Sequence, residues 1–195
     1  GIILMGEDFK NPWDISAPKS GRIKNVSELL DSSIMPGIQG GPLMHIIAAK
    51  AVAFKEALTQ EFKLYIKQTV SNAKYLANQL LEYGYDVVTN GTDTHLVLLD
   101  LSRKNISGKA AENALESAGI TTNKNMVPYD KRSPMITSGI RLGTPAITSR
   151  GIKEKEIELI AKKIDLVLKN IDNKKILTQV KQEIIELCNC FKLYK

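Results

Sequence analysis

Residues 95–118 read HLVLLDLSRKNISGKAAENALESA. Within them the pattern of apolar residues changes from that of a strand to that of a helix, and this change decides the fold class. The run His95–Leu101 is apolar at nearly every position, which predicts a strand with no solvent-facing side. Ser107 is a suitable N-cap for a helix that runs to Ala118 and ends at Gly119. Strands that alternate with helices in this way predict an α/β fold.

Other parts of the chain extend this pattern. Alanine enrichment predicts a helix over residues 43–58, and an apolar stripe stopped by Gly84 predicts another over residues 60–83. Isoleucines at helical spacing mark two C-terminal helices, over 157–171 and 176–187. Short strands are predicted at residues 2–5, 87–88, 120–123 and 140–146. A boundary near residue 58 predicts two parts, residues 1–58 and 59–195.

The composition is that of a globular protein. Of 195 residues, 43% are hydrophobic and 25% charged, so the chain has enough apolar residues to form a sizeable core. Lys and Arg number 27 against 21 Asp and Glu, a formal net charge of +6. Only five of the 27 are Arg and the lysines are dispersed, which favours a lysine-rich composition over a nucleic-acid surface. A non-catalytic basic module for RNA or a regulatory partner is the alternative, and it rests on this charge alone.

Cysteine, histidine and hydropathy patterns give three further expectations. Cys188 and Cys190 are two residues apart in a helical pattern, which does not suit a disulfide framework. His45 and His95 lie far from both in the sequence, so the spacing does not suit a metal site either. A reducing, cytoplasmic location is therefore expected. No apolar run approaches the ~20 residues of a membrane span. The opening Gly1 followed at once by an apolar run suggests a piece of something longer.

The stretch PGIQGGP at residues 36–42 could form an anion-binding loop. Gly40 and Gly41 let backbone N–H groups face outward, and Pro42 suits the first turn of the helix that follows, whose dipole favours an anion such as phosphate. The stretch lacks the Gly-Lys-Ser/Thr ending of a nucleotide P-loop. A tight turn that only starts a helix explains the same residues equally well.

Two further stretches carry candidate binding residues. Arg141 lies between Gly139 and Gly143, and its planar fork suits a carboxylate, which could belong to a substrate or to an internal Asp or Glu. Asn123–Asn125 and the pair Ser133-Pro134 precede it in a loop whose donors and acceptors suit a heterocycle. Asn, Ser and Pro are also ordinary turn residues, so loop chemistry accounts for them as well.

Together, the stretches at residues 36–58, 90–101 and 120–151 resemble serine hydroxymethyltransferases. The resemblance runs from about Leu29 to the end of the chain. It implies the C-terminal part of an aspartate-aminotransferase-type (fold type I) enzyme that uses pyridoxal phosphate. On this basis, residues 1–58 would be the tail of the large cofactor-binding domain, and residues 59–195 the small C-terminal α/β domain. The implied reaction interconverts serine and glycine with tetrahydrofolate as the one-carbon carrier.

The resemblance also assigns roles to individual residues. Arg141 would hold the substrate carboxylate, and Gly40 and Gly41 would contact the cofactor phosphate of the neighbouring subunit in a homodimer. Asn125 and the segment Ser133, Pro134 and Met135 would contact folate. The family usually has an aromatic residue where this chain has Met135, and the stretch Glu7–Asn25 is longer than in many members.

The family's Schiff-base lysine has no counterpart in this sequence. That lysine lies in a Thr-rich His-Lys motif just before a strand similar to Gly1–Leu4, and none of the lysines here occupies such a motif. Lys50 has the most apolar neighbours but no matching context. The resemblance therefore implies that this chain alone is inactive, and that it is either a fragment or one half of a split enzyme whose N-terminal half supplies the lysine. A decayed remnant of the family is a further possibility.

Overall fold

The computed structural model describes residues 1–193. The chain divides into two compact units, Gly1–Ala57 and Leu58–Lys195. The first unit contains α1 (Val26–Ser32), a π-helical turn at Ser33–Ile38 and α2 (Met44–Ala57). The second contains α3 (Gln60–Glu82), β1 (Asp86–Val87), β2 (Leu96–Asp100), α4 (Gly108–Ser117), β3 (Asn123–Asn125), β4 (Gly139–Gly143), α5 (Pro145–Ser149), α6 (Glu154–Lys169) and α7 (Lys174–Cys190). Short 3-10 turns lie at Val88–Asn90 and Ser102–Lys104. The described part of the chain is thus a mixed α/β structure.

Local capping contacts determine where the helices of the second unit begin and end. The Thr59 hydroxyl accepts the Phe62 N–H at 3.2 Å, and the Ser107 hydroxyl accepts the Ala110 N–H at 3.1 Å. Both satisfy backbone donors that the first helical turn leaves free. Gly84 and Gly119 follow α3 and α4 with φ of +76° and +78°, the left-handed conformation that ends a helix. The predicted helices at 60–83 and 108–118 are confirmed.

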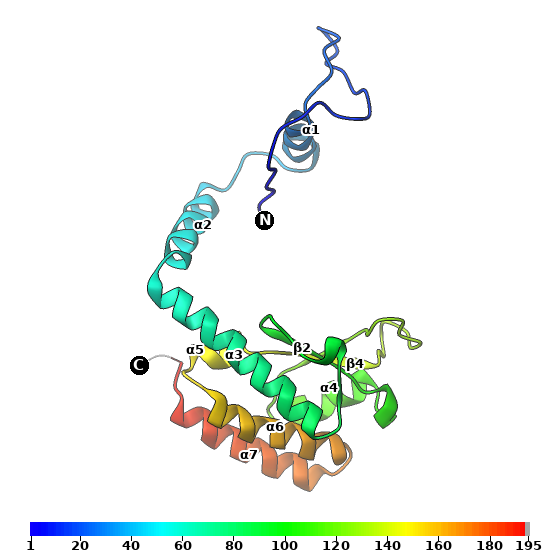
Figure 1. Cartoon of the computed structure of the whole chain (residues 1–195), viewed down its shortest axis with the longest axis vertical. Coiled ribbons are helices and arrows are strands. Elements are labelled where there is room, and N and C mark those ends of the chain that lie inside the picture. The colour runs from blue at the N-terminus through cyan, green and yellow to red at the C-terminus, as the bar shows by residue number, and fades with distance from the viewer. Residues whose placement is uncertain (194–195) are drawn as a thin grey trace. The chain divides into compact units, whose positions relative to one another are not determined.

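The four strands form one antiparallel sheet in the order β1-β2-β4-β3. Helices α3 and α4 contact the strands, and α6 and α7 pack against α3 and α4 (Figure 1). Side chains that alternate along the two central strands point into this helical layer and are buried: Val97, Leu99, Ile140 and Leu142. They belong to a core that also includes Leu80, Leu101, Leu115, Ile157 and Ile164.

The other face of the sheet is open, and here one prediction was wrong. The apolar run His95–Leu101 predicted a strand with both faces covered, yet Leu96 and Leu98 are only half-buried. In this unit the helices contribute their apolar stripes to one side of the sheet, so every second residue of β2 faces outward. The open face carries the candidate site described below.

Three other predicted strands differ from the structure. Residues 2–5 form no strand and are exposed, because an apolar run without a neighbouring strand has nothing to pair with. The strand predicted at 120–123 is displaced to β3, since the Ile120 N–H caps α4 by binding the Leu115 carbonyl at 2.8 Å. The strand predicted at 140–146 stops at Gly143, because Pro145 starts the short helix α5.

Residues 8–25 of the first unit form a loop closed by polar contacts, some of them with the first turn of α1. Asn11, 3% exposed, donates to the Lys24 carbonyl at 2.7 Å and the Ile15 carbonyl at 2.9 Å. Arg22 binds Glu28 with both terminal nitrogens, and this guanidinium, helped by the Asn25 N–H, lowers the pKa of Glu28 to about 2. Because hydrogen bonds rather than an apolar core organise this loop, its hydropathy pattern did not predict α1.

No helix within residues 1–193 is long and apolar enough to cross a membrane. The same residues contain no group of three or more His, Cys, Asp or Glu side chains that could hold a metal ion.

Candidate functional site

Arg141 lies at the centre of the open sheet face. In the strand register, it is directly opposite Leu98 on β2 and Asn123 on β3. Directly opposed residues in antiparallel strands point to the same side, so Leu98, Arg141 and Asn123 form a row across the open face. The guanidinium is exposed, and its Nη2 donates to Asn123 Oδ1 at 3.2 Å.

The charge of Arg141 has no counter-ion in the described part of the chain. None of the ion pairs formed among residues 1–193 involves it, and Asn123 is a neutral partner. The internal Asp or Glu that would give this arginine a purely structural role is therefore absent from these residues. An exposed guanidinium with most of its donors free is suited to bidentate binding of an external carboxylate.

The loop that follows β3 is organised by Asp130, which sequence reasoning missed. Its Oδ1 accepts the Ser138 hydroxyl at 2.7 Å and the Arg132 N–H at 2.9 Å. Its Oδ2 accepts the Ser138 N–H at 2.8 Å and the Val127 N–H at 3.3 Å. Asp130 thus joins both ends of the loop, and a signal for it existed in the Asx turn that Asp130 makes with Arg132.

These contacts also fix the charge of Asp130. Partial burial by itself would raise the pKa, but the hydrogen bonds from Ser138, Arg132 and Val127 together lower the pKa of Asp130 to about 2. All of them favour the ionised carboxylate. The carboxylate is therefore the form that holds the loop at neutral pH.

Two glycines allow the loop to lie close to the sheet and to α4. A Cβ on Gly139 would come within 2.6 Å of the Leu99 carbonyl oxygen and 2.7 Å of a Val127 methyl carbon. A Cβ on Gly108 would come within 2.0 Å of the Thr137 hydroxyl and 2.3 Å of the Gly139 carbonyl oxygen. Close backbone approach explains why glycine is required at both positions. Arg132 adds a tether by donating to the Ile106 carbonyl at 2.7 Å.

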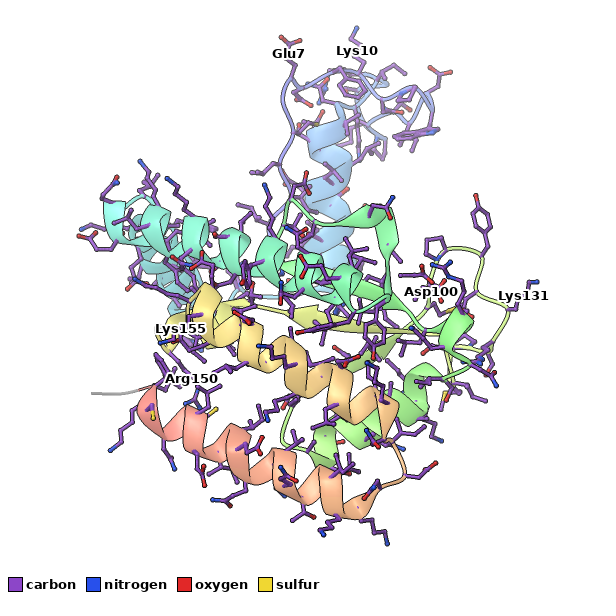
Figure 2. The ribbon with its side chains drawn as sticks, turned by 60° about the horizontal axis from the view of Figure 1, so that its bottom comes forward. Glu7, Lys10, Asp100, Lys131, Arg150 and Lys155 are labelled. Atoms are coloured by element: carbon purple, nitrogen blue, oxygen red, sulfur yellow. The ribbon has the colours of Figure 1, made fainter. Side chains whose placement is uncertain are left out.

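The predicted folate-contacting residues all belong to this part of the second unit. Asn125 lies at the end of β3, and its side-chain amide donates to the Met126 carbonyl at 2.7 Å. Ser133 and Pro134 are exposed, and the Ser133 carbonyl accepts the Ile136 and Thr137 N–H groups, each at 2.9 Å. Met135 is 72% exposed, and Lys131 extends from the loop into solvent (Figure 2). The loop therefore presents polar atoms to solvent together with the largely exposed apolar side chain of Met135.

Gly40 and Gly41 belong to the first unit and lie just before α2. Both are exposed, and a Cβ at either would meet no atom within 4 Å. The helix begins at Met44 and not beside Pro42, because the Leu43 carbonyl accepts the Ile46 and Ile47 N–H groups at 3.0 and 3.2 Å. The expectation that Pro42 occupies the first helical turn was wrong. The backbone before this helix is nonetheless open to an anion.

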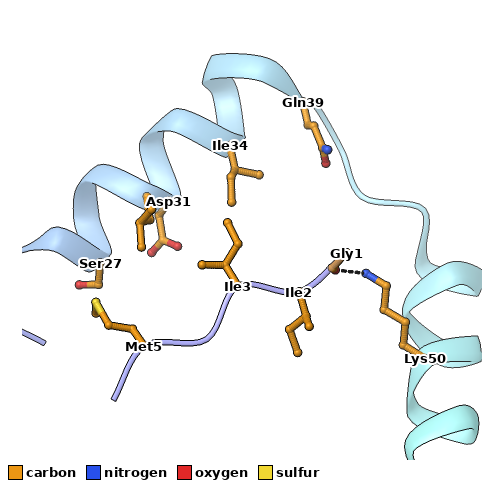
Figure 3. Close-up of a pocket in the computed structure, with 10 residues that line it drawn as sticks. Gly1, Ile2, Ile3, Met5, Ser27, Asp31, Ile34, Gln39 and Lys50 are labelled. Carbon is orange, nitrogen blue, oxygen red and sulfur yellow. Dashed lines mark hydrogen bonds between the residues drawn. The ribbon is translucent and has the colours of Figure 1, made fainter. Parts of the chain in front are cut away.

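Lys50 lies beside a pocket of the first unit. The pocket has a volume of about 530 Å³ and is lined by Gly1, Ile3, Gln39 and other residues of that unit. The Lys50 ammonium donates to the Gly1 carbonyl oxygen at 2.8 Å (Figure 3). Lys50 is thus held by a backbone group and keeps two further N–H donors.

These features define a mixed α/β protein with an unpaired arginine on an open sheet face, next to a loop held by a carboxylate. A comparison with known families extends this conclusion. The family described as serine hydroxymethyltransferase matches residues 2–164. The chain belongs to the serine hydroxymethyltransferase family, which consists of enzymes dependent on pyridoxal phosphate.

Proposed function

We propose that this chain provides the substrate-carboxylate and folate contacts of a serine hydroxymethyltransferase, which interconverts serine and glycine with tetrahydrofolate. The observation that carries the proposal is the exposed Arg141 guanidinium, which has a neutral partner and no ion pair within residues 1–193. A serine or glycine carboxylate would supply the missing charge. Leu98 beside it would limit the water around that ion pair, which strengthens the interaction.

The loop held by Asp130 would take the folate cosubstrate. Asn125 at its start and Ser133 and Pro134 near its middle offer polar atoms, and the exposed Met135 offers an apolar surface to a planar heterocycle. Methionine is flexible, so it would pack against the ring less rigidly than the aromatic residue usual at this position. Asp130 would act as a positioning residue by holding the backbone of the loop.

The residues present also fit pyridoxal phosphate in part. Gly40 and Gly41 have open backbone before a helix of 14 residues, which suits the cofactor phosphate of a neighbouring subunit in a homodimer. When bound, the cofactor supplies an electron sink for carbanion chemistry at the amino acid. The role of this chain would be to orient the amino acid by its carboxylate at Arg141.

The cofactor lysine would come from residues other than Gly1–Lys195. Residues 1–58 would form the tail of the large domain, and residues 59–195 the small domain of an aspartate-aminotransferase-type fold. Lys50 differs from a cofactor lysine because its ammonium binds the Gly1 carbonyl. We infer that residues 1–195 alone do not turn over substrate and that a half carrying the lysine completes the enzyme.

The test is the absorbance of pyridoxal phosphate with glycine, measured with this chain alone and then with the large-domain half of a serine hydroxymethyltransferase. We expect a glycine-dependent spectral change beyond that of pyridoxal phosphate and glycine without protein only in the mixture, and we expect Arg141→Gln to abolish it. Arg103→Gln is the matched control, because Arg103 is an exposed arginine of the same unit that pairs with Asp86. This control should behave like the unmodified chain.

Two results would contradict the proposal. Equal glycine dependence in the Arg141→Gln and unmodified mixtures would remove the carboxylate role. Borohydride trapping of pyridoxal phosphate on Lys50 in the isolated chain, followed by peptide mass spectrometry, would show that the chain provides its own cofactor lysine.

A further inference from the structure

The second unit contains an apolar cavity that the proposed function does not use. Its volume is about 290 Å³, and it lies between β4, α5, α6 and α7. Its walls include Leu142, Ile164 and Ile184, each less than a tenth exposed. The cavity opens to solvent at Gly119, Thr121, Gly143 and Ala146, which are exposed. A space of this size above buried isoleucines and leucines is nearly as large as a small-molecule site.

One charged side chain lines this cavity. Arg150 follows α5 (Figure 2). Its Nη1 donates to the Phe191 carbonyl at 3.0 Å and to the Cys188 carbonyl at 3.5 Å. Those two bonds involve one of its three nitrogens, and the described residues provide no carboxylate ion pair for it. Because a guanidinium has five N–H donors, Nε and Nη2 remain able to bind an anion.

We propose that this cavity binds a small aliphatic carboxylate, with its hydrocarbon chain among the isoleucines and its carboxylate on Arg150. Octanoate has this chemistry and serves as the probe. The apolar walls favour the chain, and the unpaired guanidinium selects an anion over a cation or an alcohol.

The cysteines provide a site-specific measurement. Cys188 lines the cavity, whereas Cys190 is exposed on the same helix, and both are free thiols. In the chain of residues 1–195, alkylation rates of the two thiols can be followed separately by peptide mass spectrometry. Octanoate below its micelle concentration should slow the alkylation of Cys188 at least about fivefold and leave that of Cys190 unchanged. Octylamine, a cation of the same length, should protect neither.

Variants then separate the two parts of the proposal. Arg150→Gln should raise the octanoate concentration for half-protection about tenfold, while Arg150→Lys, which keeps the charge, should raise it less. Ala146→Leu should block the mouth of the cavity and abolish protection, since Ala146 lines the cavity and is exposed at its opening. Arg141→Gln should leave protection unchanged, because Arg141 does not line the cavity.

The proposal is overturned if octanoate fails to protect Cys188, or if it protects both thiols equally. Protection that persists in Ala146→Leu would place the ligand elsewhere. Equal protection by octylamine would show an apolar cavity without selection for carboxylates. Saturation-transfer NMR of octanoate provides a second readout if a variant changes the intrinsic reactivity of Cys188.

Discussion

Ser138 donates both its N–H and its hydroxyl to Asp130, at 2.8 and 2.7 Å, one to each carboxylate oxygen. The two residues are eight positions apart, and the loop between them carries Ser133, Pro134 and Met135. One carboxylate therefore fixes the start and end of the segment that we expect to contact folate.

Asp130→Ala should loosen the loop without unfolding the second unit. The amides of Arg132 and Ser138 lose a charged acceptor, and hydrogen bonds to charged groups contribute about 1.5–3 kcal/mol each. We expect amide hydrogen exchange at residues 130–138 to accelerate at least about tenfold. Lys131→Ala, at the exposed neighbouring position, is the control and should change nothing. Unaltered exchange in Asp130→Ala would show that the loop is held in another way.

The order of this loop should depend on acidity in a defined direction. The pKa of Asp130 is lowered from 3.8 to about 2 in the folded protein. A depressed pKa contributes stability that is fully present above the unfolded value and is lost as pH falls through the folded value. The protection of residues 130–138, which is their exchange rate corrected for the intrinsic pH dependence of amide exchange, should thus be constant above about pH 4 and fall between pH 4 and 2. Asp130→Asn should lack this dependence, and an identical profile in that variant would assign it to another group.

Gly139→Ala should destabilise the second unit by about 1–3 kcal/mol. The new Cβ would come within 3.0 Å of three atoms, two of them backbone oxygens of Leu99 and Asn125 that cannot move without disturbing the sheet. Gly143→Ala on the same strand is the control, because its Cβ would meet the nearest atom, a Leu96 methyl carbon, at an ordinary 3.5 Å. Urea denaturation measures both. Equal stability of the two variants would contradict the close approach at Gly139.

Asn72→Ala should also destabilise this unit, by about 1–3 kcal/mol. The Asn72 side chain is fully buried and donates to the Thr148 hydroxyl and to the Ile152 carbonyl, both at 2.9 Å. Removing the amide leaves the Ile152 carbonyl without this donor in a buried place. Asn78→Ala, on the exposed side of the same helix, should be nearly neutral in the same denaturation experiment. A neutral Asn72→Ala would indicate that water replaces the amide.

Local signals in the sequence predicted the helices of the second unit well. Ser107, Gly84 and Gly119 act within one helical turn, so their effect is visible in a short stretch of sequence. The open sheet face was not predictable in the same way. Whether Leu96 and Leu98 are covered depends on where distant helices pack, and an apolar run gives no information about that.

The residues of the candidate site were likewise predictable only in part. The residues around Arg141 predicted that it needs an anion but left open a substrate carboxylate or an internal Asp or Glu; the family resemblance implied the substrate, and the structure adds that Asn123 is its neighbour. The roles of Gly40, Gly41, Asn125, Ser133, Pro134 and Met135 came from the family resemblance and stay predictions. Asp130 was missed because three of its four donors belong to Ser138 and Val127, which the tertiary fold brings to it.

The burial pattern of the two units has a thermodynamic consequence. Within Gly1–Ala57, all of which the structure describes, Asn11 is the only buried residue, and the apolar core lies entirely within the second unit. Typical domains gain about 12–15 cal/mol/K of heat capacity per residue on unfolding, because unfolding hydrates buried apolar surface. Disrupting the polar loop around Asn11 hydrates very little such surface. The heat-capacity change on unfolding of the isolated chain should therefore scale with the length of the second unit. Unfolding of the first unit should contribute almost no heat-capacity change in a calorimeter.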